Sequence, residues 1–138
     1  SVLRPINYVI SKICHYVVNI KKINHKLNLG NINITRDWGW CEEYVLIVWK
    51  LLKTKPDNFI IGTGKNFSLK YMLINAFKIM KLDWKKYVLI NKDYKRKGDL
   101  LKLSADIRKT IIRSKTTPKI YGIKILKKLI NHYKVSIE

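Results

Sequence analysis

Acidic residues are few in this 138-residue chain: 9 Asp and Glu stand against 29 Lys and Arg, which gives a formal net charge of +20. Glycine occurs only six times and proline three times, while 47% of the residues are hydrophobic, so the composition excludes a disordered linker. The longest apolar run is the six residues from Tyr44 to Trp49. A helix needs about 20 apolar residues to cross a bilayer. We therefore expect no membrane partner and a single domain over residues 1–138.

Cysteines and glycine motifs for nucleotides are equally scarce. Cys14 and Cys41 stand alone, without a CxxC pair or a Cys/His cluster at metal-ligand spacing. We interpret them as reduced thiols of a cytosolic protein, with a disulfide between them as the alternative. The sequence contains no GxGxxG, GxxxxGK[ST] or GxSxG motif. It therefore predicts no metal site and lacks the usual Gly-rich turn for binding a dinucleotide.

The basic residues are mostly lysines, 24 of them against five arginines. Lys, Ile and Asn share A/T-rich codons, and the chain has 21 Ile and 11 Asn, so a compositional bias explains the charge without an anionic partner. The lysines are spread along the whole chain, whereas arginine is the residue that best recognises phosphates and bases. We therefore expect no nucleic-acid partner, with polyanion binding as the alternative.

Apolar periodicity predicts helices and short strands in alternation. A stripe at spacings of three and four predicts a helix over about residues 5–22. Its members are Ile6, Ile10, Ile13, Val17 and Ile20. A short strand or turn is expected at 28–31. Residues 42–53 are apolar nearly all round and predict a buried helix, and 58–61 predict a short buried strand.

The second half of the chain continues this alternation. Ser68 is a candidate N-cap for the clearest amphipathic helix. The apolar stripe of that helix is Leu69, Met72, Leu73, Ala76, Phe77 and Met80. A strand is predicted at 87–90, and Asp106 is a candidate cap for a short helix over 107–112. The last helix is expected over about 121–133, with Ile123, Leu126, Ile130 and Tyr133 facing inward. Helices mixed with short strands fit an α/β or α+β fold.

Two cationic segments carry the candidate chemistry. Arg36-Asp37-Trp38-Gly39-Trp40 places a guanidinium, which recognises planar anions, just before the predicted buried helix. A surface Arg–Asp pair beside an anchoring Trp is the alternative. Arg96-Lys97-Gly98-Asp99 would hold a phosphate and a sugar hydroxyl, with an exposed turn as the alternative. The remaining aromatic residues are assigned to the core, with Trp38 and Trp40 as the candidate exceptions.

Other reactive side chains have simpler interpretations. Tyr8 and Lys12 have YxxxK spacing and would share a helix face. No nucleotide-binding core precedes them, so a phosphate contact by Lys12 is favoured over acid–base catalysis. The three histidines are scattered and are interpreted as polar-face residues. Asp37, Glu42 and Glu43 cluster near a helix start, where capping and helix-dipole roles are favoured.

With these motifs in place, the chain closely resembles the C-terminal part of the GDP-mannose 4,6-dehydratase family of extended short-chain dehydrogenases. The resemblance extends from Ser1 to about Lys134. The segments that carry it are Leu29-Gly30-Asn31, Thr35-Arg36-Asp37-Trp38-Gly39-Trp40, Glu43-Tyr44-Val45, Asp57-Asn58-Phe59-Ile60-Ile61-Gly62-Thr63-Gly64, Ser68-Leu69, Ala76-Phe77 and Leu82-Asp83-Trp84-Lys85-Lys86-Tyr87-Val88. The RDWG block is the specific part, because related sugar-nucleotide epimerases and reductases usually keep the Arg-Asp without the Trp-Gly.

The resemblance implies a fold and an activity. The fold would be α/β, the α+β-like small substrate-binding domain of an NAD(P)-dependent epimerase/dehydratase, with the N-terminal Rossmann core absent from this chain. The family consists of lyases that convert GDP-mannose to GDP-4-dehydro-6-deoxy-D-mannose with a tightly held NADP. Its catalytic Thr, Glu, Tyr and Lys lie upstream of this stretch. The resemblance therefore implies no catalytic residue here, a fragment that is inactive alone, and a homo-oligomeric full-length enzyme.

The resemblance also assigns binding residues. Arg4 matches a contact to NADP. The positions that match contacts to GDP-mannose are Val9 at the guanine, Lys12 at the diphosphate, and Asn31 and Arg36 around the diphosphate. Arg96 and Asp99 match an Arg-Pro-x-Glu motif, in which the arginine takes phosphate and the acid takes ribose hydroxyls.

Several positions depart from the family pattern. The replacements are Val2 and Leu3 for Pro-Arg, Ile6 and Asn7 for Glu-Thr, Lys97 for Pro, and Asp99 for Glu. The segment 114–118 replaces Leu-Gly-Trp-Lys-Pro, which removes a core Trp. The chain starts at Ser1 without Met or a signal-peptide layout, so we expect a cytoplasmic protein that begins inside a longer gene product. An inactive truncated remnant and a basic nucleic-acid-binding module are the alternatives.

Overall fold

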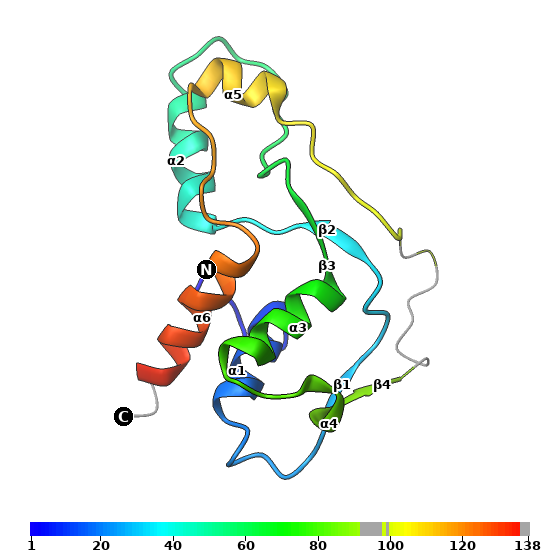
Figure 1. Ribbon diagram of the computed structural model, residues 1–138. Helices are drawn as coiled ribbons and strands as arrows, with labels where there is room; N and C mark the ends of the chain where they lie inside the picture. The colour runs from blue at the N-terminus through cyan, green and yellow to red at the C-terminus, as the bar shows by residue number, and fades with distance from the viewer. Residues whose placement is uncertain (92–97, 99, 136–138) are drawn as a thin grey trace.

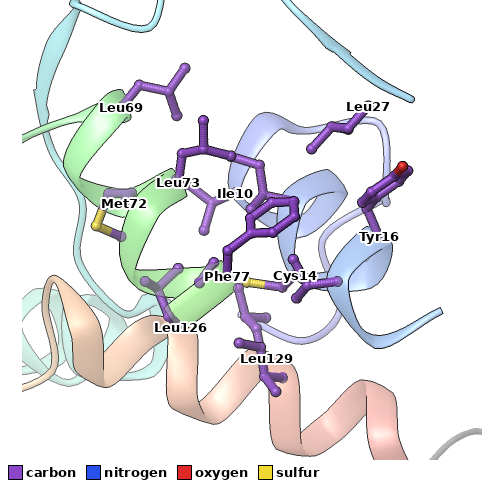
Figure 2. Packing of buried hydrophobic residues seen from close by; sticks show 14 of the residues in the cluster. Ile10, Cys14, Tyr16, Leu27, Leu69, Met72, Leu73, Phe77, Leu126 and Leu129 are labelled. Atoms are coloured by element: carbon purple, nitrogen blue, oxygen red, sulfur yellow. The ribbon is translucent and has the colours of Figure 1, made fainter. Parts of the chain in front are cut away.

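The computed structural model describes residues 1–91, 98 and 100–135. Its main core lies between three helices, α1 (Val9–Val18), α3 (Leu69–Ile79) and α6 (Ile123–Val135), each of which packs against the other two. Figure 1 shows how these helices come together, and Figure 2 shows their apolar side chains meeting. Phe77 from α3 and Leu126 from α6 are fully buried at this junction. The largest hydrophobic cluster therefore forms where three amphipathic stripes face one another.

Helix α3 begins as predicted. The Ser68 hydroxyl accepts a hydrogen bond from the Tyr71 N–H at 3.1 Å, which satisfies one of the free donors of the first turn. The predicted stripe is buried from Leu69 to Phe77, and Met80 is half-buried at the C-cap. The sequence periodicity therefore identified both the start and the buried face of this helix.

Helix α6 also agrees with the prediction over most of its length. Its buried residues are Ile125, Leu126, Leu129, Ile130 and Tyr133. Ile123 is only half-buried, because it lies in the first turn, and Lys124, Lys127, Lys128 and Lys134 are exposed as expected. Across all the residues that the structure describes, no helix is long and apolar enough to span a membrane.

Helix α1 is shorter than the predicted range of 5–22. It starts after Tyr8, whose side chain forms no capping hydrogen bond. It stops where the main-chain N–H and the side-chain amide of Asn19 both donate to the His15 carbonyl, at 3.1 and 3.0 Å. Such local side-chain bonds compete with continuation of a helix. The stripe members within α1 are buried, whereas Ile6, which precedes the helix, is 53% exposed.

Two small sheets connect these helices. Strand β1 (Leu27–Leu29) pairs in parallel with β4 (Val88–Ile90), and β2 (Thr35–Asp37) pairs antiparallel with β3 (Asn66–Ser68). Segment 101–103 lies along the other edge of β2, where Thr35 donates to the Leu101 carbonyl and accepts from the Leu103 N–H. The short strand or turn predicted at 28–31 overlaps β1, and the strand predicted at 87–90 corresponds to β4. The mixture of helices and short strands agrees with the predicted class.

A buried helix is expected at 42–53, and the helix forms, but most of it is exposed. The prediction of a buried strand at 58–61 is wrong both in burial and in secondary structure. Helix α2 (Cys41–Leu51) forms, but only Ile47 and Leu51 are buried in it. It packs against α5 (Arg108–Ser114) at one end of the molecule, away from the three-helix core (Figure 1). Residues 58–61 form no strand. Two helices and a loop are too few to bury every apolar side chain that this region carries.

Two short helices complete the described fold. Helix α4 (Trp84–Tyr87) is capped by Asp83, whose carboxylate accepts from the Lys85 N–H at 3.1 Å. Before α5, the Asp106 carboxylate accepts from the Arg108 N–H at 3.1 Å and from the Arg108 guanidinium, although the N-cap residue is Ile107 and not Asp106 as predicted. These contacts lower the pKa of Asp106 to about 2, with the guanidinium hydrogen bond as the largest cause. Helix α5 itself begins at Arg108, one residue later than expected.

Candidate nucleotide site

The RDWG block is held in place through its aspartate. The Asp37 carboxylate accepts hydrogen bonds from the Thr63 hydroxyl at 2.6 Å, from the Thr63 N–H at 2.9 Å and from the Gly64 N–H at 2.8 Å. Thr63 is 3% exposed. Hydrogen bonds to a charged acceptor are stronger than neutral ones. Asp37 therefore fixes the 62–64 loop against β2, a role that its place beside Arg36 in the sequence does not reveal.

The residues after Asp37 enter the protein interior. Trp40, at the N-cap of α2, is 1% exposed and belongs to the main hydrophobic cluster, so it is a core residue and not an exception. Trp38 is partly buried against the same cluster and also lines a cavity. Gly39 bridges to Tyr121, and a Cβ there would lie 1.9 Å from the Tyr44 Oη. A larger residue at position 39 would therefore force the Tyr44 or Thr63 side chain to shift.

The acidic residues near α2 have structural roles. Glu42 and Glu43 lie in the first turn of α2, where the helix dipole favours negative charge. The Glu43 carboxylate also accepts from the Lys119 and Ile120 N–H groups at 3.0 and 2.8 Å, which docks the segment leading to α6. Burial raises the pKa of the Tyr44 hydroxyl, and the nearby charges of Asp37 and Glu43 raise it further. Tyr44 therefore stays neutral.

A cavity of about 160 Å³ lies between the N-terminal segment, α1, α6 and the RDWG block. Arg4 and Val9, which the resemblance assigns to cofactor and guanine, both line it, together with Trp38. The Arg4 guanidinium stacks over the Tyr8 ring, 4.0 Å from its centroid. Arg4 is exposed and Val9 half-buried. The cavity thus combines an apolar and aromatic wall with one accessible planar cation.

Lys12 lies one turn further along α1 and faces a different cleft. Its ammonium donates to the Asn28 carbonyl in β1 at 2.9 Å. The cleft around it is also lined by His15, His25 and Lys26. Tyr8, its partner in the YxxxK spacing, instead supports the Arg4 guanidinium. The described contacts therefore give Lys12 and Tyr8 separate partners.

Leu101 lies near both Asn31 and the strand that carries Arg36. Leu101 lines a groove together with Asn31, and its carbonyl accepts from the N–H of Thr35, the residue before Arg36. The Asn31 side chain accepts from the Asn33 N–H at 3.0 Å, which shapes the turn after β1. Arg36 Nη1 donates to the Thr35 carbonyl at 2.9 Å from a half-buried position on β2. This hydrogen bond to β2 therefore holds one nitrogen of the Arg36 guanidinium in place.

The structure brings only some of the predicted site residues together. Arg4 and Val9 share one cavity, whereas Lys12 and Asn31 line two separate clefts and Arg36 lies on β2. Arg96 and Asp99 lie outside the described residues. Sequence reasoning missed that Trp38 lines the cavity of Arg4. It also missed the hydrogen bonds between Asp37 and Thr63. The only sequence signal for them was that the RDWG and GTG segments both carry the family resemblance.

The cysteines agree with the interpretation as reduced thiols. Cys14 is buried and Cys41 is exposed, and both are free. Burial raises the pKa of the Cys14 thiol to about 12. Within residues 1–91, 98 and 100–135, no three His, Cys, Asp or Glu side chains are grouped in a way that would hold a metal ion.

Comparison with known proteins identifies what the chain is similar to. The family model described as GDP-mannose 4,6 dehydratase matches residues 1–120. GDP-mannose 4,6 dehydratase 1 of Arabidopsis thaliana is 33% identical over 127 residues, which cover 91% of this chain and 35% of that protein. The homologue from Drosophila melanogaster is 28% identical over 142 residues, covering 87% of this chain and 35% of its own. This chain thus spans about a third of the length of these relatives.

Solved structures show the same fold. An RMD from Pseudomonas aeruginosa complexed with NADPH matches with a TM-score of 0.84 at 12% identity, over 96% of this chain and 44% of its own. The UDP-glucose 4-epimerase of Thermotoga maritima with UDP-glucose matches with a TM-score of 0.78 at 21% identity, over 94% of this chain and 40% of its own. The described fold therefore also occurs within these longer chains.

Proposed function

The chain belongs to the GDP-mannose 4,6-dehydratase family, and we propose that it forms the GDP-sugar-binding part of such an enzyme, a lyase that converts GDP-mannose to GDP-4-dehydro-6-deoxy-D-mannose. The observation that carries the proposal is the match of the family model over residues 1–120, a stretch that includes every residue assigned to binding. The catalytic groups and the Rossmann core would belong to polypeptide outside these 138 residues. This chain alone would then bind substrate without turning it over.

The described residues suit a nucleotide diphosphate. A diphosphate carries about two negative charges, and planar guanidiniums hold such groups through paired hydrogen bonds. Arg36 supplies one guanidinium on β2, and Lys12 supplies an ammonium near β1. Asn31, on the turn after β1, would contribute an amide to the diphosphate from its own cleft, which is separate from the cleft of Lys12. Arg96 and Asp99 would complete this grip at phosphate and ribose. Val9 would contact the guanine from the start of α1.

NADP is the cofactor that we propose, because the family uses it and a structural neighbour binds NADPH. The site fits a phosphate-bearing cofactor in one respect: Arg4 presents an exposed guanidinium at the rim of a cavity walled by Tyr8 and Trp38. When bound, NADP supplies the hydride chemistry at C4 and C6 of the sugar. Arg4 would bind its phosphate, while Tyr8 orients the guanidinium. We also propose a cytoplasmic location and a homo-oligomeric full-length enzyme.

Calorimetric titration of the 138-residue chain with GDP tests the binding proposal. We expect saturable 1:1 binding of GDP that is at least tenfold tighter than binding of UDP or inorganic pyrophosphate. The comparison matters because a net charge of +20 attracts any anion. Equal affinity for the three ligands, or no GDP binding by a folded chain, would exclude the proposal.

The charge favours one second candidate, a basic module that binds nucleic acid. Such binding releases counterions, so its affinity falls steeply with salt concentration and does not depend on base sequence. Gel-shift titration of duplex DNA at salt concentrations from about 50 to about 200 mM, a range over which such affinities fall steeply, would distinguish nucleic-acid binding from GDP binding. A third reading, an inactive remnant, predicts neither GDP protection nor cooperative thermal unfolding.

A further inference from the structure

The fold separates the carboxylates from many of the lysines, although the lysines are spread along the sequence. Helices α1, α3 and α6, which form the main core, carry no acidic residue. The acidic residues that the structure describes are Asp37, Glu42, Glu43, Asp57, Asp83 and Asp106. Two of them form ion pairs beside α5, Asp57 with Lys109 and Asp106 with Arg108. Within the described residues, the three core helices therefore present positive charge without a carboxylate of their own.

The outer sides of α3 and α6, called the basic face below, carry a group of exposed lysines. They are Lys70 and Lys78 on α3, Lys81 directly after its C-cap, and Lys124, Lys127, Lys128 and Lys134 on α6. The i, i+3, i+4 spacing of Lys124, Lys127 and Lys128 places them on one side of α6. Among the residues described, no carboxylate forms an ion pair with any of these lysines. The apolar sides of both helices are buried in the core, so the charged sides are left for a partner.

An aromatic row of Phe67, Tyr71 and Tyr121 joins the starts of the two helices. The Phe67 ring stacks on the Tyr71 ring with 5.4 Å between centroids and on the Tyr121 ring with 6.2 Å. Gly122 makes room for Phe67, since a Cβ there would lie 2.9 Å from the Phe67 Cζ. Tyr71 is 39% exposed, and the Lys124 ammonium lies 5.8 Å from the Tyr121 ring centroid. The row therefore brings aromatic rings to the surface between the lysines of α3 and α6.

Lysines around aromatic rings match the chemistry of a nucleic-acid single strand. Its phosphates bind lysines and release counterions, and its bases stack on aromatic rings whatever their identity. A duplex offers phosphates but keeps its bases stacked on one another. Protein interfaces are depleted in lysine, and stable attachment to a membrane needs an inserted apolar group besides basic residues. The rings and the lysines together therefore favour a single strand.

We propose that the basic face and the aromatic row bind single-stranded nucleic acid without sequence preference, with the phosphates at the lysines and a base at the exposed Tyr71 ring. This activity goes beyond the binding of a GDP-sugar. No residue assigned to GDP-mannose or NADP belongs to the basic face or to the aromatic row. The same chain would therefore hold GDP and a single strand at the same time.

Two carboxylates lie near one end of this surface. Asp37 lies opposite Asn66 in the register of β2 with β3, and Glu43 accepts hydrogen bonds from the N–H groups of 119 and 120. Asp37 likewise accepts from the N–H groups of 63 and 64, so main-chain donors stabilise both charges. The carboxylates still repel phosphates. The strand should therefore run from the aromatic row along α3 and α6, away from β2.

Fluorescence anisotropy with a labelled oligothymidine of about 16 nucleotides tests the position of the site. The 138-residue chain is titrated at salt concentrations from about 50 to about 200 mM. We expect Lys124→Glu with Lys127→Glu to weaken binding at least about tenfold and to flatten its salt dependence. The matched control is Lys53→Glu with Lys55→Glu, which changes the net charge equally at exposed positions after α2 and should weaken binding less than about threefold.

Tyr71 tests the stacking part of the proposal. Tyr71→Ala should weaken binding of the single strand at least about fivefold, because the stacking of a base on the ring is lost. It should leave binding of a duplex of the same length unchanged, and Tyr71→Phe, which keeps the ring, should bind both ligands like the natural chain. Oligouridine replaces oligothymidine in a parallel titration, and tight binding of either polymer supports the proposal. Thermal unfolding followed by circular dichroism separates lost binding from lost folding.

Other results overturn the proposal. These are equal losses in the two pairs of lysine variants, unchanged single-strand binding by folded Tyr71→Ala, a duplex bound as tightly as the single strand, and displacement of the oligonucleotide by GDP. Displacement by GDP would place the strand in the nucleotide site. Binding of anionic phospholipid vesicles in place of the oligonucleotide, lost with Lys124→Glu and Lys127→Glu, would assign the basic face to a membrane. A chain that fails to bind GDP would leave the oligonucleotide titrations unaffected.

Discussion

The Asp37 carboxylate and the buried Thr63 hydroxyl lie 2.6 Å apart, and the Thr63 N–H donates to the same carboxylate at 2.9 Å. This contact joins β2 to the loop before β3, 26 residues later. A charged acceptor with three donors is costly to disturb, because any donor removed leaves part of a half-buried charge unsatisfied. The RDWG and GTG segments thus form one structural unit.

Thr63→Val should destabilise the protein through this unit. It removes the hydroxyl that donates to Asp37 and keeps the size of the side chain, so we expect a loss of about 2 kcal/mol in the free energy of unfolding. Chemical denaturation followed by circular dichroism measures it. Thr117→Val is the control, because Thr117 is exposed. Equal effects of the two substitutions would show that the bond to Asp37 contributes nothing.

Gly39→Ala should destabilise by steric overlap. The new Cβ would lie 1.9 Å from the Tyr44 Oη and 2.7 Å from the Thr63 Cγ2, and such overpacking costs about 1–3 kcal/mol. Tyr44→Ala removes both nearest atoms, the Oη and the Cζ at 2.4 Å, so Gly39→Ala should cost less in a Tyr44→Ala background than in the natural chain in the same denaturation experiment. An undiminished cost in that background would mean that the Thr63 methyl group, and not Tyr44, opposes the new Cβ.

Arg36→Ala should weaken GDP binding by about 2–3 kcal/mol if the guanidinium is a charged partner of the phosphates. Since each 1.4 kcal/mol is a factor of about ten in Kd, calorimetry will resolve this change easily. Arg113→Ala on α5 removes the same charge from an exposed position away from β2. A matching loss in the control would indicate general electrostatic attraction, and no loss in Arg36→Ala would remove this residue from the site.

The two thiols should differ in reactivity at neutral pH. Iodoacetamide should modify the exposed Cys41 and spare Cys14, because only an accessible thiolate reacts and burial raises the pKa of Cys14 to about 12. Peptide mass spectrometry of the native chain distinguishes the two sites. In denaturant, both cysteines should react. Rapid labelling of Cys14 in the native chain would contradict its place in the core.

Cys14 also predicts a direction for stability against pH. Its pKa is raised from 9.0 in the unfolded chain to about 12 in the folded one, so the unfolded state loses its proton first. The stabilisation is complete below pH 9 and falls as pH rises from 9 towards 12, by up to about 1.4 kcal/mol per pH unit. The free energy of unfolding is measured for the natural chain and for Cys14→Ala between about pH 8 and about pH 10, on either side of the unfolded pKa. The difference between the two proteins separates the effect of Cys14 from that of the lysines. Parallel stability curves for the two proteins would refute it.

The elements whose signals are local could be predicted from the sequence alone. The Ser68 cap, the stripe of α3 and the inward face of α6 follow from capping and from the 3.6-residue period, which need no knowledge of distant partners. The family could likewise be inferred from contiguous motifs. The early end of α1 at Asn19 could not, because the apolar stripe continues beyond that residue in the sequence while the Asn19 side-chain amide donates to the His15 carbonyl.

Which apolar residues are covered, and which site residues meet, depends on the packing of elements that are distant in the sequence. Hydrophobicity alone predicted burial for α2 and 58–61, but burial requires a neighbouring layer, and the neighbours of α2 are α5 and a loop. Trp40 is buried in the core and Trp38 lines the Arg4 cavity, although the two are nearly adjacent in the sequence. The Asp37 carboxylate accepts hydrogen bonds from Thr63, which is distant in the sequence, because the pairing of β2 with β3 brings the 62–64 loop to the carboxylate. Long-range contacts of this kind are set by packing, and no local pattern encodes them.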